Sequence, residues 1–186
     1  MENYEFSSST RVWLLEWARQ SIDHFLRESE ESAPEPLPEQ VMLQRGAFVS
    51  LHKRGGDLRG CIGTFESLNP LWVTIRELAI SAATCDPRFR PLKADELRQC
   101  DIEISILSAK ESISVESIEV GKHGLWVSQG HRRGVLLPQV AISRGWNSKQ
   151  FLEQTCVKAG LSPNAWMAET TKIEAFRAEV FAESCD

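Results

Sequence analysis

The 186-residue chain contains the stretch Leu58-Arg59-Gly60-Cys61-Ile62-Gly63-Thr64-Phe65, which we interpret as a β-strand. The apolar residues Phe48, Val49 and Leu51 precede it, and the segment Lys53-Arg54-Gly55-Gly56-Asp57 lies between the two runs. Two apolar runs joined by a short segment that contains glycine are typical of a β-hairpin. The sequence therefore predicts an antiparallel hairpin at this point of the fold.

Side chains alternate between the two faces of an extended strand. On that basis Arg59 and Cys61 share one face, and Leu58 and Ile62 share the other. A fixed positive charge beside a cysteine favours the thiolate, which is the reactive form. Cys61 is therefore a candidate nucleophile or redox thiol, and Arg59 a candidate for binding an anionic group of a substrate.

Two glycines in the same strand need an explanation, because glycine weakens a strand interior. It usually marks a bulge, a bend or the close approach of a ligand to the backbone. Backbone amides beside an arginine suit a carboxylate or a phosphate, so Gly60, Gly63 and the adjacent Thr64 are candidate substrate-binding residues. The alternative is structural: Cys61 is a small buried apolar residue, Arg59 a surface charge, and the glycines part of a bulge.

The segment Asp86-Pro87-Arg88-Phe89-Arg90-Pro91 is neither helix nor central strand, because its prolines restrict the backbone. We expect an ordered loop. In a functional interpretation Asp86 orients a base, while Arg88, with Phe89 beside it, binds a phosphate or carboxylate. In a structural interpretation Asp86 and Arg88 form an ion pair that holds the loop.

The remaining chain mixes helical and alternating patterns without a regular strand-helix-strand repeat, which favours an antiparallel α+β fold. We expect one domain spanning residues 1–186. The predicted elements are a helix capped by Thr10 and running to about Glu28, a helix of about fourteen residues after Asn69-Pro70, a strand at 101–107, a hairpin at 124–138, a helix capped by Asn147 and Ser148, and one strand at 172–181.

Composition limits the classes of function. The net charge of −5 and the pI near 5.5 favour a small molecule or a protein over a nucleic acid as the partner. Five scattered cysteines with no Cys-x-x-Cys pair argue against a disulfide framework and a zinc site, so we expect no metal and no cofactor. With no leader peptide and no apolar segment of the ~20 residues that a membrane span requires, we expect a cytoplasmic protein with no membrane association.

The hexapeptide Leu58-Arg59-Gly60-Cys61-Ile62-Gly63 resembles the signature of the AMMECR-one domain family. Further similarity extends over the chain from about Gly46 to Phe181, and its segments are Gly46 to Leu51, Asp86 to Phe89 with Pro91, Glu96-Leu97, Ile102 to Leu107, Gly121 to Leu125, Leu136 to Ala141, and Lys158 to Leu161. The resemblance implies two intimate subdomains, each with a small antiparallel sheet and helices. The larger is formed by both chain ends and the smaller by a middle segment, with the signature near the cleft between them.

The same resemblance implies that the protein is similar to the A component of a bacterial three-part system. Its other components are a Memo-like protein and a radical S-adenosylmethionine protein, which are therefore candidate partners in modifying a biomolecule. The matched segment around His123 makes that histidine the candidate general base for Cys61, since an imidazole titrates near neutral pH. The alternative function is that of a non-catalytic accessory protein, whose cleft binds a small molecule, an anionic group or a protein partner.

Overall fold

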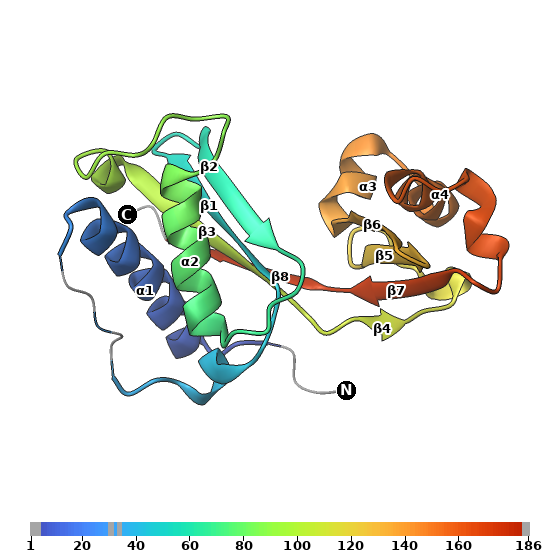
Figure 1. Cartoon of the computed structure of the whole chain (residues 1–186), viewed down its shortest axis with the longest axis horizontal. Helices are drawn as coiled ribbons and strands as arrows, with labels where there is room; N and C mark the ends of the chain where they lie inside the picture. The colour runs from blue at the N-terminus through green and yellow to red at the C-terminus, as the bar shows by residue number, and fades with distance from the viewer. Residues whose placement is uncertain (1–4, 30–31, 33–34, 184–186) are drawn as a thin grey trace. The chain divides into compact units, whose positions relative to one another are not determined.

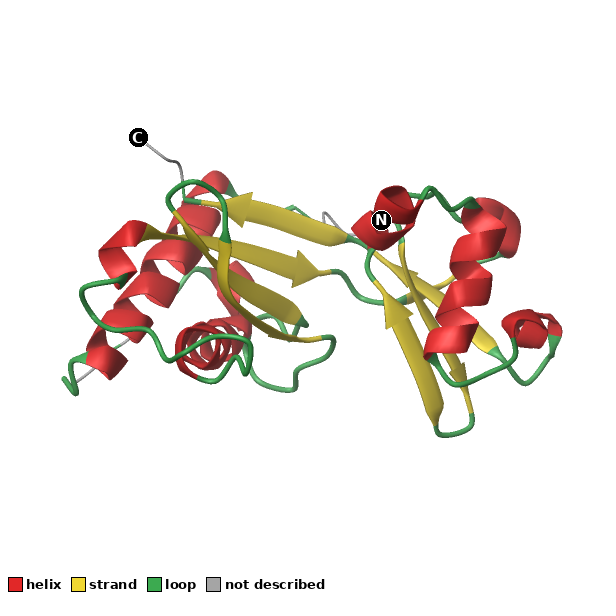
Figure 2. Ribbon diagram, turned by 90° about the horizontal axis from the view of Figure 1, so that it is seen from above, coloured by secondary structure: helices red, strands yellow, loops and turns green. Residues whose placement is uncertain are grey.

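The computed structural model describes residues 5–29, 32 and 35–183, and the chain divides into two compact units (Figures 1 and 2). Unit 1 comprises Met1–Leu107 with Glu179–Asp186, and unit 2 comprises Ser108–Ala178. Each unit combines helices with an antiparallel sheet, which confirms the predicted α+β class. In the described part of the chain, no helix is both long enough and apolar enough to cross a membrane.

The sheet of unit 1 has the strand order β2-β1-β3-β8. The strands are β1 (Ala47–Lys53), β2 (Leu58–Thr64), β3 (Cys100–Leu107) and β8 (Ala178–Ala182). The pairing of β1 with β2 confirms the predicted hairpin. The alternation predicted for residues 101–107 is also confirmed, because Ile102, Ile104 and Ile106 are completely buried.

Two helices pack against this sheet: α1 (Ser8–Leu26) on β3, and α2 (Leu71–Thr84) on β1 and β2 (Figure 1). The predicted cap of α1 at Thr10 is wrong. The N-cap is Ser7, whose side chain accepts a hydrogen bond from the Thr10 N–H. Thr10 therefore lies in the first turn, where its side chain is buried.

Helix α2 has the predicted length of 14 residues and begins directly after Pro70. Its close approach to β2 requires glycine at position 60. A β-carbon placed there would lie 2.2 Å from the carbonyl oxygen of Ala82, which belongs to the backbone of α2. The strand and the helix can therefore pack at this distance only without a side chain at Gly60.

Unit 2 has a second sheet with the strand order β4-β7-β5-β6. Its elements are β4 (Glu111–Ser112), β5 (Gly124–Gln129), β6 (Arg132–Leu136), α3 (Pro138–Arg144), α4 (Ser148–Lys158) and β7 (Lys172–Phe176). Strands β5 and β6 confirm the second predicted hairpin. Helix α4 confirms the predicted helix, with Asn147 and Gln150 forming a capping box at its start.

Two predictions for the C-terminal half are corrected by the structure. The predicted second hairpin extended to Pro138, but that proline begins helix α3, where its fixed φ suits the first turn. The single strand predicted at 172–181 is two strands, β7 and β8, which pair in different sheets and are separated by Arg177. An alternating pattern cannot show that a chain changes sheet halfway along it.

Candidate functional site

The signature strand β2 contains a bulge that changes the partner of Arg59. Leu51 pairs with Gly60 and His52 pairs with Leu58, which leaves Arg59 as the extra residue. A bulge interrupts the alternation of side chains along a strand. The predicted sharing of one face by Arg59 and Cys61 rested on regular alternation, which this bulge interrupts between the two residues.

The Arg59 guanidinium is directed to Glu96, in the segment before β3. Its Nη2 lies 3.2 Å from Glu96 Oε2, and only 9% of the arginine side chain is exposed. Glu96 Oε2 also accepts a hydrogen bond from the Lys93 N–H, and the pKa of Glu96 is lowered, mainly by its hydrogen bond from Arg59. Arg59 thus ties β2 to the 93–97 segment through a charge-assisted pair.

Cys61 lies instead beside the loop that follows α2. Its backbone N–H donates a 2.8 Å hydrogen bond to Asp86 Oδ2, and its carbonyl oxygen lies 3.4 Å from Arg88 Nη2. Strand β2 is at the edge of the sheet, so these groups are on the side away from β1. The structure therefore brings Cys61, Asp86 and Arg88 together.

The Asp86 carboxylate is the centre of this cluster, and its side chain is only 2% exposed. In addition to the hydrogen bond from the Cys61 N–H, the carboxylate accepts three from Arg88. These come from the Arg88 N–H at 3.0 Å, from Nε at 3.0 Å and from Nη2 at 2.7 Å. The hydrogen bonds from the Arg88 side chain hold the pKa of Asp86 well below its usual range, with smaller contributions from the two backbone N–H groups. Asp86 is therefore an anion that fixes the loop against β2.

Arg88 combines a fixed position with solvent access. Its side chain is 55% exposed although two of its nitrogens are hydrogen bonded to Asp86, and its guanidinium lies 5.5 Å from the centre of the Phe89 ring. The pKa of Arg88 is raised, mainly by its hydrogen bond to Asp86, and the nearby Cys61 thiol acts in the same direction. An arginine held in this way can bind a carboxylate or phosphate while it remains next to Cys61.

The other signature residues have structural neighbours that explain them. A β-carbon on Gly63 would lie 2.0 Å from the Phe48 ring, so this glycine leaves room for the aromatic side chain across the strand pair. Thr64 Oγ1 donates a 2.7 Å hydrogen bond to the carbonyl oxygen of Glu66 and so stabilises the turn after β2. With Gly60 packed against α2, these three positions are occupied by contacts within unit 1.

His123 belongs to unit 2, whereas Cys61 belongs to unit 1. Its ring is buried, and Nδ1 accepts a 3.1 Å hydrogen bond from the Glu119 N–H. Burial lowers the pKa of His123, which favours the neutral ring that this hydrogen bond requires. His123 therefore stabilises the 119–123 turn through this hydrogen bond.

The remaining cysteines differ from Cys61 in exposure. Cys100 and Cys156 are buried, and burial raises the pKa of both thiols, whereas Cys85 is exposed. Cys185 lies outside the described residues. Within the described ranges, no group of three or more His, Cys, Asp and Glu side chains is arranged to hold a metal ion.

The AMMECR1 family model matches residues 15–181 of this chain. The chain belongs to the AMMECR1 family. A protein of Methanothermobacter thermautotrophicus is 45% identical to it over 178 residues, which cover 91% of this chain and 92% of the relative. A protein of Methanopyrus kandleri is 41% identical over 180 residues, with coverage of 92% and 87%. The resemblance inferred from the hexapeptide is therefore confirmed for nearly the whole chain.

The fold of this AMMECR1 protein is similar to that of a solved structure, an uncharacterised protein of Pyrococcus horikoshii. The TM-score is 0.80 at 36% sequence identity, over 96% of this chain and 94% of the other. The two archaeal sequence relatives are named only as proteins, so these comparisons identify the family and the fold.

Sequence reasoning did not identify Glu96 as the partner of Arg59. Its position within the matched Glu96-Leu97 segment was the available signal. A buried arginine requires a carboxylate close by, but the sequence alone does not show which of the 26 acidic residues provides it.

Proposed function

We propose that this AMMECR1 protein acts through Cys61 as a reactive thiol, with Arg88 binding an anionic group of the molecule that it modifies. The observation that carries the proposal is the position of Arg88, which a buried carboxylate holds beside Cys61 while more than half of the arginine side chain faces solvent. A fixed, accessible guanidinium next to a partly buried thiol is the arrangement expected of an activated cysteine.

The substrate would be a biomolecule with a carboxylate or phosphate close to the reacting atom. In the three-part system that the family resemblance implies, a Memo-like protein and a radical S-adenosylmethionine protein would act on the same substrate. We assign no chemical role to His123, because its ring nitrogen is used in the 119–123 turn. We infer a cytoplasmic location, where thiols stay reduced.

The test is the rate of alkylation of each cysteine by iodoacetamide in the native protein, measured by mass spectrometry of peptides. Cys85 serves as an exposed reference thiol, and Cys100 and Cys156 as buried ones. If Cys61 is activated, it reacts faster than Cys85 although it is less exposed. Arg88→Gln should then slow Cys61 about two- to fivefold, the range for one interaction between exposed charges.

Arg90→Gln is the matched control, because it removes an exposed arginine from the same loop, two residues away. It should leave the Cys61 rate unchanged. A Cys61 that reacts no faster than Cys85, or that is unaffected by Arg88→Gln, would contradict the proposal.

The second candidate is a non-catalytic accessory protein, in which the signature serves only as a structural corner. The contacts of Gly60 and Gly63 with their neighbours favour it, because they explain both glycines without a ligand. Protection of Cys61 until the protein unfolds, together with full activity of a reconstituted three-protein system that contains Cys61→Ala, would support this function.

A further inference from the structure

Strand β2 is the outer strand of the unit 1 sheet, and Cys61 lies in its middle (Figure 1). In an antiparallel pair, the backbone groups of every second residue bond to the neighbouring strand, and those of the residues between point away from it. The Cys61 N–H points away from β1, because it donates to Asp86 Oδ2. Gly63 follows two residues later in the same regular pairing, so its N–H and C=O also point away from β1.

This outer edge is closed by side chains at Cys61 but not at Gly63. At Cys61, Asp86 accepts from the N–H and Arg88 Nη2 lies 3.4 Å from the carbonyl oxygen, so two side chains take the place of a neighbouring strand. Gly63 is partly exposed, and within the described ranges no residue hydrogen bonds to its outward N–H or C=O. An unpaired donor and acceptor on an edge strand are the groups with which an extended peptide pairs.

Arg88 limits how far such a peptide can extend. A strand that enters from the Thr64 side and pairs with Gly63 runs antiparallel to β2, and one residue later it reaches the Cys61 carbonyl. The Arg88 guanidinium already lies at that carbonyl, so main-chain pairing stops there. A peptide that ends at this point places its C-terminal carboxylate against the guanidinium. A parallel strand would instead place an N-terminal ammonium group there, which the guanidinium repels.

Arg88 also keeps a donor for that carboxylate. Its Nε and Nη2 are hydrogen bonded to Asp86, whereas Nη1 has no hydrogen-bond partner in the part of the chain that the structure describes. The side chain is 55% exposed although Asp86 fixes its position. A guanidinium that is held in place before binding forms a charge-assisted hydrogen bond to a carboxylate with little further loss of freedom.

Phe48 provides an apolar contact beside Gly63. A β-carbon on Gly63 would lie 2.0 Å from the Phe48 ring, so the ring extends over this glycine towards the outer edge of the sheet. Residues directly opposite each other on paired strands point to the same face. A peptide residue opposite Gly63 therefore directs its side chain to the face where Phe48 lies, partly exposed. An apolar side chain is favoured at that position of the peptide.

We propose that β2 binds the C-terminal end of a protein as an added antiparallel strand. The penultimate residue of that protein exchanges two backbone hydrogen bonds with Gly63, and its apolar side chain packs on Phe48. The terminal carboxylate lies at Arg88, beside Cys61. The inference rests on the proposed function, because it identifies the molecule that carries the anionic group as a protein C-terminus.

The test is a titration of the isotope-labelled full chain with an acetylated tetrapeptide, Thr-Val-Phe-Ala, followed through the backbone amide resonances. The Gly63 resonance should shift as the peptide binds. Two matched peptides each lack one contact: the first ends in a carboxamide, and the second has an N-methyl group on phenylalanine. Each should bind about tenfold more weakly, because each lacks one hydrogen bond to the protein. An unshifted Gly63 resonance, or equal affinity for the three peptides, would overturn the proposal.

A variant of Arg88 identifies the partner of the carboxylate. Arg88→Gln should remove the preference for the carboxylate over the carboxamide. It should keep the discrimination against the N-methyl peptide, which shows that the edge of β2 is intact. Arg90→Gln, which replaces an exposed arginine of the same loop, should keep both preferences. A preference for the carboxylate that survives Arg88→Gln would refute the assigned contact.

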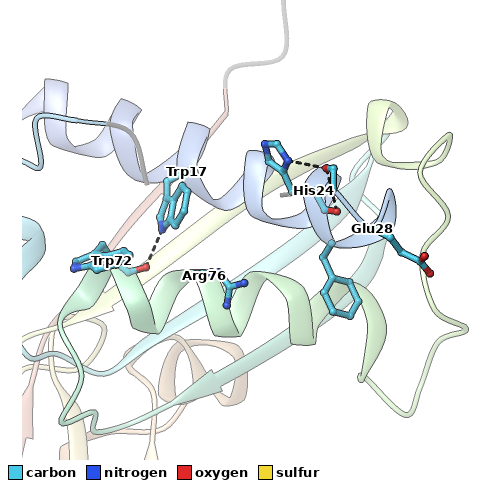
Figure 3. Close-up of a pocket in the computed structure, with 7 residues that line it drawn as sticks. Trp17, His24, Glu28, Trp72 and Arg76 are labelled. Carbon is cyan, nitrogen blue, oxygen red and sulfur yellow. Dashed lines mark hydrogen bonds between the residues drawn. The ribbon is translucent and has the colours of Figure 1, made fainter. Parts of the chain in front are cut away.

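A competing place for an apolar side chain of the probe is a pocket of about 570 Å³ between α1 and α2 (Figure 3). Trp17 and Trp72 line it with ring centroids 6.1 Å apart, and Trp17 Nε1 donates a 2.9 Å hydrogen bond to the Trp72 carbonyl oxygen. The pocket shares no residue with the edge of β2. Phe25→Ser, which changes a 52% exposed residue of its lining, should therefore leave the affinity unchanged. Loss of affinity in this variant would place the peptide in the pocket and overturn the proposal.

Peptide binding and thiol reactivity are separate outcomes. Cys61→Ala should bind the tetrapeptide as the wild type does, because none of the assigned contacts involves the thiol. The alkylation rates that test the activation of Cys61 are measured without peptide. An activated Cys61 in a protein that does not bind the tetrapeptide would leave the proposed function standing and remove only the protein C-terminus as its substrate.

Discussion

Replacing Asp86 by asparagine tests whether the buried carboxylate holds the 86–91 loop on strand β2. Asp86 Oδ2 accepts from the Cys61 N–H and Arg88 Nη2, and Oδ1 accepts from the Arg88 N–H and Nε. The amide group of asparagine must place its nitrogen at one of these two positions. Two N–H donors then face another donor, and the negative charge is lost.

The cost follows from which hydrogen bonds disappear. A hydrogen bond to a charged group contributes about 1.5–3 kcal/mol, but the Arg88 guanidinium can be hydrated instead, because its side chain is 55% exposed. One partly buried backbone N–H, that of Cys61 or that of Arg88, is left without an acceptor in either orientation of the amide. Asp86→Asn should therefore lower the free energy of unfolding by about 2 kcal/mol at pH 7.

The effect should depend on pH with a defined sign. The pKa of Asp86 is lower in the folded protein than in the unfolded chain, where it is about 3.9. The stabilisation is therefore complete above the unfolded value and is lost as the pH falls towards the folded one. The difference between wild type and Asp86→Asn should be about 1 kcal/mol smaller at pH 3 than at pH 7.

Urea denaturation followed by tryptophan fluorescence measures both quantities. Asp95→Asn is the matched control, because Asp95 is an exposed aspartate in the next segment of the chain. It should change stability by less than about 0.5 kcal/mol. An Asp86→Asn protein as stable as this control, or a difference from wild type that is equal at the two pH values, would refute the role assigned to Asp86.

Three further changes to unit 1 have expected effects on urea denaturation at pH 7. Gly60→Ala should destabilise by about 2–3 kcal/mol, because the new methyl group would meet the Ala82 carbonyl; a neutral effect would mean that α2 moves freely. Ser21→Ala should stabilise by about 1 kcal/mol, since the Ser21 hydroxyl is fully buried and has no hydrogen-bond partner among the described residues; destabilisation would reveal a partner. Glu28→Gly should stabilise by about 1 kcal/mol by relieving the positive φ; unchanged stability would mean that the backbone is unstrained.

Much of the fold could be predicted because its signals are local. The alternation at 101–107 required only that one face of the strand be buried, and the capping residues before α4 mark its start by direct contact with the first turn. Helix α3 was not predicted, because its start has no such local signal. Its first residue, Pro138, follows an apolar strand without a polar cap, so no local signal separates the two elements.

The site was predicted in part. The residues Cys61, Asp86, Arg88 and Phe89 were selected from two segments about 25 positions apart, and the structure places them together. Their contacts could not be predicted, because they depend on how the loop after α2 returns to the edge of the sheet. The pocket between α1 and α2 was not predicted either. Only the packing of the two helices shows that a space remains between them.

The arginine that contacts Cys61 is Arg88, whereas the sequence pattern suggested Arg59. In a regular strand, residues two apart share a face, and the chain contains an arginine two positions before Cys61. One extra residue opposite the Leu51–His52 step interrupts this alternation, and the Arg59 guanidinium forms an ion pair with Glu96. The charge next to the thiol then comes from the loop after α2. That charge exists at Cys61 only while Asp86 holds the loop, so any condition that releases the loop should also lower the reactivity of Cys61.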